Sequence, residues 1–208
     1  MKKQKPKEDL KVLILEAAKK LFVQQGYEST SIRKIAQEIG FSPTSIYLHY
    51  KDKNDLIYNL HQVGFGLLRD RFMPLVVVED PYERLKAAGK NYIEFALDNP
   101  EYYEVMFMMR EPMDFLNHNC DEEHWLEGER VLDFLRNTVL ECQSKGYFQG
   151  MQAEDVTLQA WAAVHGLVSL YLTQHLDHVI DVIGAKSTSK EMIYSSFQVL
   201  LKLMLDAK

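Results

Sequence analysis

Hydrophobic residues recur every three or four positions along most of the chain, which is the spacing of an amphipathic α-helix. No segment shows the alternation typical of a strand, and glycine and proline together number only 16 of 208 residues. The pattern therefore predicts an all-α protein. The expected helices cover residues 10–25, 30–40, 42–50, 55–73, 81–97, 100–110, 122–145, 153–175 and 189–205.

The first three expected helices are short and closely spaced. Gly26 ends the first, and Thr30 is a candidate N-cap of the second. Gly40 can adopt the left-handed conformation that ends a helix, and Ser42 followed by Pro43 supplies an N-cap and a first helical residue. Two short helices joined by about three residues with a glycine at the corner are typical of a helix-turn-helix unit.

The third helix is expected to present an unusual outer face. Ile46 and Tyr50 share one side, which predicts that they join the core, while the other side carries small hydroxyl residues together with Tyr47 and Leu48. Hydroxyls and a phenol can bind phosphates, and a leucine can contact a thymine methyl group. This composition favours a helix that lies in a DNA major groove. The alternative is that Tyr47 and Leu48 pack against the rest of the chain.

Charge is divided unevenly along the sequence. Residues 1–53 hold 11 Lys and Arg against 6 Asp and Glu, a net charge of +5, whereas residues 54–208 hold 13 against 24, a net charge of −11. A basic N-terminal part suggests contact with a polyanion, although the lysines at positions 2, 3, 5 and 7 also fit a solvated tail. Asp52 is expected to cap a helix with Asp55 at its third position, and Lys53 to complete an anion site there.

Residues 26–36 and 40–53 read GYESTSIRKIA and GFSPTSIYLHYKDK, and they resemble the DNA-binding domain of TetR-family transcriptional regulators. The resemblance covers about the first 60 residues. It implies a helix-turn-helix domain over residues 1–52, followed by a helical domain over 53–208 that binds an effector and forms a homodimer. Family members often carry Lys-Gly-Thr at 43–45 and His or Tyr at 48, so the operator sequence is left open. The DNA-contact residues implied are Thr30, Ser31, Ser42, Pro43, Thr44, Ser45, Tyr47, Leu48, His49 and Lys53.

The helix expected over 153–175 carries two apolar stripes, so it must be covered on two sides. Trp161, His165 and Gly166 also resemble the Trp-x-x-x-His-Gly signature of one TetR C-terminal subfamily, which acts there in helix packing and assembly. With the last helix this segment predicts a four-helix dimer interface. The alternative is that the stripes only close the core of one chain. The predicted interface residues are Ala163, Gly166, Leu167, Leu170, Phe197, Leu200, Leu201 and Met204.

Aromatic and methionine side chains are dense between residues 92 and 115, where a helix break is expected at Pro112. Methionine suits adaptable apolar sites, so this segment predicts a pocket for a small-molecule effector. Ordinary core packing is the alternative, and His165 fits a hydrogen-bonded core histidine as well as a ligand contact. The candidate pocket residues are Tyr92, Phe95, Tyr103, Met106, Phe107, Met109, Phe115, Trp161 and His165.

Other chemistries are poorly supported by the sequence. Residues 118–124 offer metal-ligand types without metal-binding spacing, no catalytic or nucleotide-binding motif is present, and no cofactor is expected. The longest apolar stretch, residues 73–78, is far below the roughly 18 residues of a membrane span, and two cysteines fit a reducing cytoplasm. The prediction is a cytoplasmic, non-enzymatic, homodimeric repressor released from its double-stranded DNA operator by a small hydrophobic ligand. The alternative is a helical small-molecule or metal binder whose N-terminal domain does not bind DNA.

Overall fold

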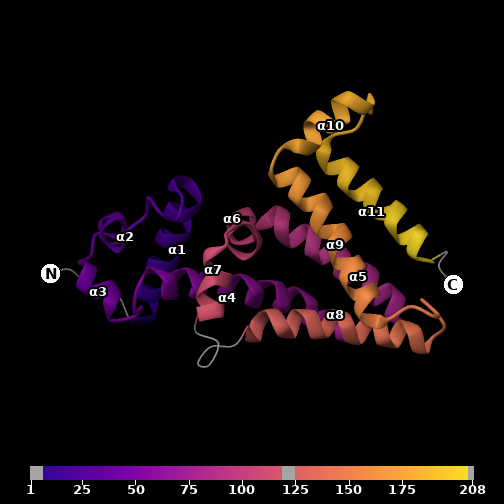
Figure 1. Cartoon of the computed structure of the whole chain (residues 1–208), viewed down its shortest axis with the longest axis horizontal. Helices are drawn as coiled ribbons and strands as arrows, with labels where there is room; N and C mark the ends of the chain where they lie inside the picture. Colours follow the sequence, from indigo (N-terminus) through magenta and orange to yellow (C-terminus); the bar gives the residue numbers. More distant parts are fainter. Residues whose placement is uncertain (1–6, 119–124, 206–208) are drawn as a thin grey trace. The chain divides into compact units, whose positions relative to one another are not determined.

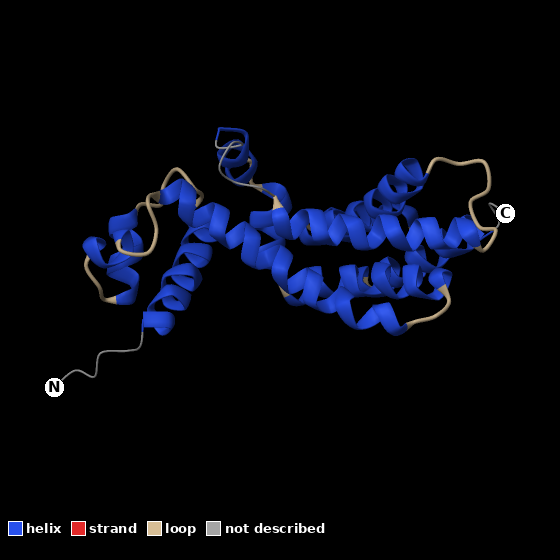
Figure 2. Ribbon diagram, turned by 90° about the horizontal axis from the view of Figure 1, so that it is seen from below, coloured by secondary structure: helices blue, strands red, loops and turns tan. Residues whose placement is uncertain are grey.

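The structure is a computed structural model that describes residues 7–118 and 125–205. Within these ranges the chain is helical and contains no strand, so the predicted all-α class is confirmed (Figures 1 and 2). The α-helices are α1 (Lys7–Gln25), α2 (Ile32–Ile39), α3 (Pro43–Tyr47), α4 (Lys53–Phe72), α5 (Pro81–Asp98), α6 (Pro100–Tyr103), α7 (Glu111–His118), α8 (Leu126–Ser144), α9 (Ala153–Leu172), α10 (His175–Ile183) and α11 (Ser189–Leu205). A 3-10 helix, η1 (Met73–Val77), and a π-helix, η2 (Glu104–Met108), complete the described secondary structure.

The chain forms two compact units. Unit 1 comprises residues 1–67 and 101–128, and unit 2 comprises residues 68–100 and 129–208. Unit 1 therefore holds the helix-turn-helix segment together with α6, η2 and α7, because α1 contacts η2. The functional boundary expected between residues 52 and 53 stays a prediction. The packing units follow a different division.

The caps of α2 explain why this helix is only eight residues long. Its N-cap is Ser31, whose hydroxyl accepts the Lys34 N–H at 3.3 Å, so the expectation that Thr30 caps the helix is wrong. At the other end Gly40 has φ +72°, and the amide of Phe41 donates to the Ala36 carbonyl at 2.9 Å. A glycine adopts this left-handed backbone without steric cost, and so the chain turns here toward α3.

Helix α3 is shorter than the sequence predicts. Ser42 caps it, with its hydroxyl accepting the Ser45 N–H at 3.2 Å, and Leu48 is already the C-terminal cap. The amides of His49 and Tyr50 both donate to the carbonyl of Ile46, so the backbone makes one further turn after the helix ends. Ile46 and Tyr50 are buried, as expected from their shared side.

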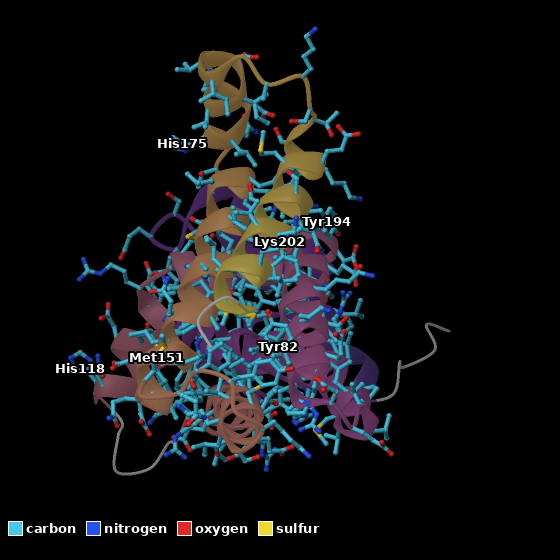
Figure 3. The ribbon with its side chains drawn as sticks, turned by 90° about the vertical axis from the view of Figure 1, so that its right-hand side faces the viewer. Tyr82, His118, Met151, His175, Tyr194 and Lys202 are labelled. Atoms are coloured by element: carbon cyan, nitrogen blue, oxygen red, sulfur yellow. The ribbon has the colours of Figure 1, made fainter. Side chains whose placement is uncertain are left out.

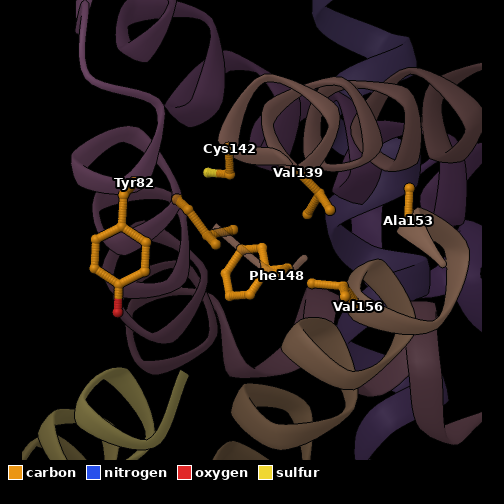
Figure 4. Packing of buried hydrophobic residues seen from close by; sticks show 7 residues of the cluster. Tyr82, Val139, Cys142, Phe148, Ala153 and Val156 are labelled. Carbon is orange, nitrogen blue, oxygen red and sulfur yellow. The ribbon is translucent and has the colours of Figure 1, made fainter. Parts of the chain in front are cut away.

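Unit 2 is built around α9, which contacts α5, α10 and α11. Part of its core is an apolar cluster contributed by α5, α8, α9 and the segment between α8 and α9 (Figure 4). Arg84 fixes the start of α5, because its guanidinium donates to the Val78 carbonyl and pairs with Glu141 of α8 at 2.8 Å. The residues of the cluster are Tyr82, Leu85, Val139, Cys142, Phe148, Ala153 and Val156.

Several helix boundaries differ from expectation. Residues 153–175 are not one helix, because α9 ends at Leu172 and a separate helix, α10, follows. The expected break is present, because η2 ends at Met108 and α7 begins at Glu111. Pro112 itself lies in the first turn of α7, where a proline is tolerated, and a helix rather than a loop follows it. Within the described ranges no single helix has the length and composition to cross a bilayer. Helices α9 and α10 meet both criteria only as a pair, which is bent by 93°.

Candidate functional site

The outer face of the α2–α3 segment is exposed. Tyr47 and Leu48 are 56% and 77% exposed, and Thr44 is exposed beside them. The prediction that this face points away from the protein core is therefore confirmed. Ser31 and Ser42 are also exposed, while Pro43, Ser45, His49 and Lys53 are partly exposed.

Thr30 is the exception among the predicted contact residues. Its side chain is only 2% exposed, and its hydroxyl lies 2.9 Å from the Gly26 carbonyl and 3.2 Å from the Leu21 carbonyl. The single hydroxyl proton is thus used within the protein, where it ties the end of α1 to the start of α2. Thr30 has a structural role in the free protein, and its contact with phosphate stays a prediction. Ser31, one residue later, is exposed at the same helix start.

Lys53 joins the beginnings of α2 and α4. Its ammonium donates to the carbonyls of Tyr27 at 2.9 Å and Thr30 at 3.2 Å, and it lies 3.8 Å from the centre of the Tyr27 ring. The phenol of Tyr27 in turn donates to the side-chain carbonyl of Asn54. Burial raises the pKa of Tyr27 to about 12, so this phenol stays protonated as a donor. The ammonium is therefore held at a fixed place beside the start of α2, with one N–H left over for another acceptor.

Three carboxylates near this surface accept hydrogen bonds or ion pairs within the protein. Asp52 accepts the Asp55 N–H at 2.9 Å, which confirms the expected cap of α4. Asp55 accepts the Lys51 N–H at 2.7 Å, one residue earlier than in a standard capping box. Glu38 pairs with Lys20 at 2.7 Å. These contacts reduce the repulsion that a nearby phosphate backbone would meet.

Sequence reasoning missed three residues of this surface. Arg33 of α2 and Lys51 before α4 are exposed cations, and Tyr27 is the residue against which Lys53 packs. The first two were detectable as basic residues within the resembling segments. The role of Tyr27 was not, because it depends on a contact across 26 positions of the chain.

Comparison with known proteins gives the family. The family model described as "Bacterial regulatory proteins, tetR family" matches residues 14–59, and that described as "Tetracyclin repressor-like, C-terminal domain" matches residues 85–187. The chain belongs to the TetR family. It is a DNA-binding transcriptional regulator with a helix-turn-helix domain. The more specific Trp-x-x-x-His-Gly subfamily stays a prediction.

Relatives of this TetR-family regulator include proteins named as transcriptional regulators. The HTH-type transcriptional repressor AcnR of Corynebacterium diphtheriae is 25% identical over 194 residues, which are 86% of this chain and 91% of the relative. An HTH-type transcriptional regulator of Staphylococcus aureus is 32% identical over 87 residues. That match spans 41% of this chain and 47% of the relative, and so it covers less than half of the staphylococcal protein.

Solved structures share the fold over nearly the whole chain. The fatty acid degradation regulator FadR from Bacillus halodurans aligns with a TM-score of 0.73 at 20% identity, covering 96% of this chain and 97% of the other. The TetR family regulator PfmR from Thermus thermophilus aligns with a TM-score of 0.65 at 19% identity, covering 91% and 97%. At these identities the likeness concerns the fold.

The predicted effector-pocket residues divide between the two units. In unit 2, Tyr92 and Phe95 are buried, and the Tyr92 hydroxyl lies 2.9 Å from His165 Nδ1 while accepting the Trp161 indole N–H at 3.2 Å. Burial lowers the pKa of His165, which favours the neutral imidazole in its hydrogen bond with the Tyr92 hydroxyl. Trp161 and His165 thus form a hydrogen-bonded packing group with Tyr92.

The remaining pocket candidates lie in unit 1. Tyr103 and Met106 are buried in its core, and Phe107, Met109 and Phe115 are partly buried. The Phe107 ring contacts Tyr103 at 4.9 Å between centroids. These residues therefore remain candidates for a site within unit 1, separate from the group in unit 2.

The predicted dimer residues fall into two classes. Phe197 and Leu201 are 4% and 8% exposed and pack inside unit 2, where the Tyr82 hydroxyl also donates to the Leu201 carbonyl at 2.5 Å. Both side chains are therefore buried within one chain, and their place in an intermolecular interface stays a prediction. Met204 packs partly on the cluster around Tyr82. Leu170 is 41% exposed, and Ala163, Gly166, Leu167 and Leu200 are partly exposed.

The residues between 118 and 124 that offer metal-ligand types lie outside the described part of the chain, except His118. The four N-terminal lysines are also outside it, apart from the backbone of Lys7. Among the described residues no group of three or more histidine, cysteine, aspartate or glutamate side chains is arranged to hold a metal ion.

Proposed function

We propose that the protein is a cytoplasmic, homodimeric repressor that leaves its DNA operator when a small hydrophobic effector binds. The observation that carries the DNA-binding part is the exposed face of α3, where Thr44, Tyr47 and Leu48 point to solvent from a helix with capped ends. A tyrosine and a leucine exposed by more than half have no packing role within the chain. They suit the phosphates and methyl groups of a major groove.

A dimer is supported by the surface of α9 and α11. Leu158, Ala162, Gly166 and Leu170 recur every four residues along α9, and each is exposed or partly exposed. A Cβ added to Gly166 would meet no atom within 4 Å, so nothing in the chain packs on this glycine. A small residue in an exposed apolar stripe allows a second helix to approach closely.

Helix α11 offers a second exposed apolar strip. Val199 and Leu203 are 56% and 66% exposed, on the side opposite the buried Phe197 and Leu201 (Figure 3 shows α11 with Tyr194 and Lys202 labelled). Because α9 and α11 pack on each other, two copies could pair through a four-helix interface. The helix-turn-helix domains of the two copies, about 34 Å apart, would then bind successive major grooves of a palindromic operator.

The test starts with DNA sites selected from a random pool by the wild-type protein. Tyr47→Ala should weaken binding to every selected site about tenfold or more, because a phosphate contact does not depend on sequence. Leu48→Ala should change which sites are preferred. Val182→Ala on α10, where Val182 is 86% exposed, is the matched control and should leave binding unchanged.

Salt dependence separates this function from the alternative, a small-molecule or metal binder whose N-terminal domain does not bind DNA. Several phosphate contacts predict that log Kd rises steeply with log salt, with a slope near 0.9 per contact. A shallow slope and no selected site would contradict DNA-binding. Sedimentation at micromolar concentration tests the dimer, and Gly166→Leu should dissociate it while Val182→Ala does not.

A further inference from the structure

Two lysine ammonium groups in unit 1 lie over tyrosine rings. Lys53 of α4 lies 3.8 Å from the centre of the Tyr27 ring, and Lys19 of α1 lies 4.0 Å from the centre of the Tyr102 ring. An aromatic face attracts a cation, and the ring also limits the positions that the lysine side chain can take. The two pairs are built alike, so their surroundings decide what each ammonium can still bind.

The Lys19 ammonium is used within the protein. Its side chain is 9% exposed, and its nitrogen lies 2.8 Å from a carboxylate oxygen of Glu16 and 3.7 Å from one of Glu101. The Tyr102 hydroxyl donates to the same Glu16 side chain at 3.1 Å. A buried cation that is already paired with two carboxylates has neither the access nor the charge to bind another anion. This group therefore serves the packing of α1 against α6.

The Lys53 ammonium, in contrast, is held in place without being neutralised. Its two acceptors are the uncharged carbonyls of Tyr27 and Thr30, and no carboxylate of the described residues forms an ion pair with it. The carbonyls use two of its three N–H groups, so one remains. Lys53 is also partly exposed. Its positive charge is therefore available to an anion outside the protein.

The Tyr27 ring is itself fixed from two sides. It packs on Phe22 of α1, with the ring centroids 5.4 Å apart, and Phe22 is fully buried. The Tyr27 hydroxyl donates to the side-chain carbonyl of Asn54, the second residue of α4. The ring therefore connects the end of α1 with the start of α4 and gives Lys53 a rigid support.

We propose that Tyr27 is a positioning residue for DNA binding, which holds the Lys53 ammonium in place for one phosphate of the operator backbone. This inference rests on the proposed function and adds a residue that the family resemblance did not include. A mobile lysine side chain loses rotamer freedom when it binds a phosphate. The Tyr27 ring removes most of this freedom when the protein folds, so the phosphate contact forms with a side chain that is already ordered.

The first measurement is proton NMR of the free protein. Protons above the face of an aromatic ring are shifted upfield, so the Hε protons of Lys53 should be shifted upfield in the wild type. Lys53→Met assigns their signals. Tyr27→Phe keeps the ring and should keep the shift, whereas Tyr27→Leu should return these protons to the position of an ordinary lysine. Unshifted Hε protons of Lys53 in the wild type would overturn the proposal.

The second measurement is a double-mutant cycle on the Kd for a selected operator. Lys53→Met should weaken binding about tenfold in the wild type and in Tyr27→Phe, because it removes a phosphate contact. In Tyr27→Leu the same change should weaken binding about twofold or less, since an unsupported ammonium contributes little. Equal weakening in the wild type and in Tyr27→Leu would show that Tyr27 acts only in packing and would contradict the proposal.

Tyr102→Leu is the matched control, because it removes the ring beside a lysine that is buried and paired. It should leave the effect of Lys53→Met on Kd unchanged. Asn54→Ala serves if Tyr27→Leu does not fold, since Asn54 is exposed and only the partner of the Tyr27 hydroxyl is removed. It should weaken operator binding about twofold, and this weakening should be absent in Lys53→Met. The same weakening with and without Lys53 would contradict the proposal.

The two measurements together distinguish failure of this inference from failure of the proposed function. If the effect of Lys53→Met on operator binding depends on the Tyr27 ring, both stand. If the wild type binds an operator and Lys53→Met binds it equally well, the function stands and the positioning role is wrong. If the wild type selects no operator while the Lys53 Hε protons are shifted upfield, Tyr27 does hold Lys53, and the DNA-binding function is wrong together with the phosphate contact.

Discussion

Each unit of the molecule contains a tryptophan–histidine pair in an aromatic setting, and the two pairs differ in their hydrogen bonds. In unit 2 the rings of Trp161 and His165 are 5.9 Å apart, and Tyr92 joins their polar atoms. In unit 1 the rings of Trp125 and His61 are 6.4 Å apart, and no described residue pairs with their polar atoms. The hydrogen bonds of the first pair stabilise the packing of unit 2, whereas the unpaired polar atoms of the second pair cost stability in unit 1.

The largest expected effect is a loss of stability in acid. The pKa of His61 is about 4 in the folded protein and about 6.5 when unfolded, so the unfolded chain binds more protons between these values. The cost of protonating buried His61 is therefore small above pH 6.5 and grows as the pH falls toward 4, so folding stability is lost over this range. Between pH 7 and 5 this amounts to about 2 kcal/mol.

Urea unfolding at pH 7, 6 and 5 measures this loss. His165 shifts in the same direction, so the wild type should lose more than the share of His61. His61→Phe should not show the part of the loss in unfolding free energy that comes from His61. His178→Ala, on the exposed side of α10, should lose as much as the wild type. The same pH dependence in wild type and His61→Phe would show that the buried histidine is not the cause.

The next effect concerns the paired group of unit 2. Tyr92→Phe removes the hydroxyl shared by Trp161 and His165 and leaves both polar groups without it. This should lower the free energy of unfolding by about 1.5 kcal/mol, opposite in sign to His61→Phe in unit 1. Urea unfolding of Tyr92→Phe and Tyr58→Phe compares a phenol in each unit. A stabilising Tyr92→Phe would remove the distinction between the two groups.

A smaller difference in stability is expected between alanine substitutions at two glycines, each of which has a side chain packed closely against it. A Cβ at Gly89 would lie 2.8 Å from the Phe197 ring, whereas one at Gly64 would meet the Met106 sulphur at 2.5 Å. An aromatic ring held between helices cannot yield, but a thioether can rotate away. Gly89→Ala should cost about 1 kcal/mol more than Gly64→Ala in thermal unfolding. Gly66→Ala, with open space around it, is the control.

The sequence was sufficient for features that depend on neighbouring residues. The all-α class, the exposed face of α3 and the caps at Ser42 and Asp52 follow from periodicity and local hydrogen bonding. Two further features depend on distant contacts. One of them is the burial of Lys19 on α1, which is only 7% exposed although lysine is usually a surface residue.

The burial of Lys19 comes from partners far along the chain. Its ammonium pairs with Glu16 at 2.8 Å and lies 4.0 Å from the Tyr102 ring, and Tyr102 is 83 positions away. His61 was detectable in principle, because it interrupts the apolar stripe of Ile57, Phe65 and Leu68 on α4. That its nitrogens lack partners could not be read from the stripe, since this depends on distant residues such as Trp125, which packs beside it from 64 positions away.

The smallest expected effect is a coupling energy that separates the two tryptophan–histidine pairs. A double-mutant cycle of Tyr92→Phe with Trp161→Phe removes both ends of one hydrogen bond, so the losses should be non-additive by about 0.5–1 kcal/mol. The matching cycle of His61→Phe with Trp125→Phe should be additive within about 0.5 kcal/mol in the free protein. Coupling in this second cycle would mean that His61 and Trp125 already act together in the protein.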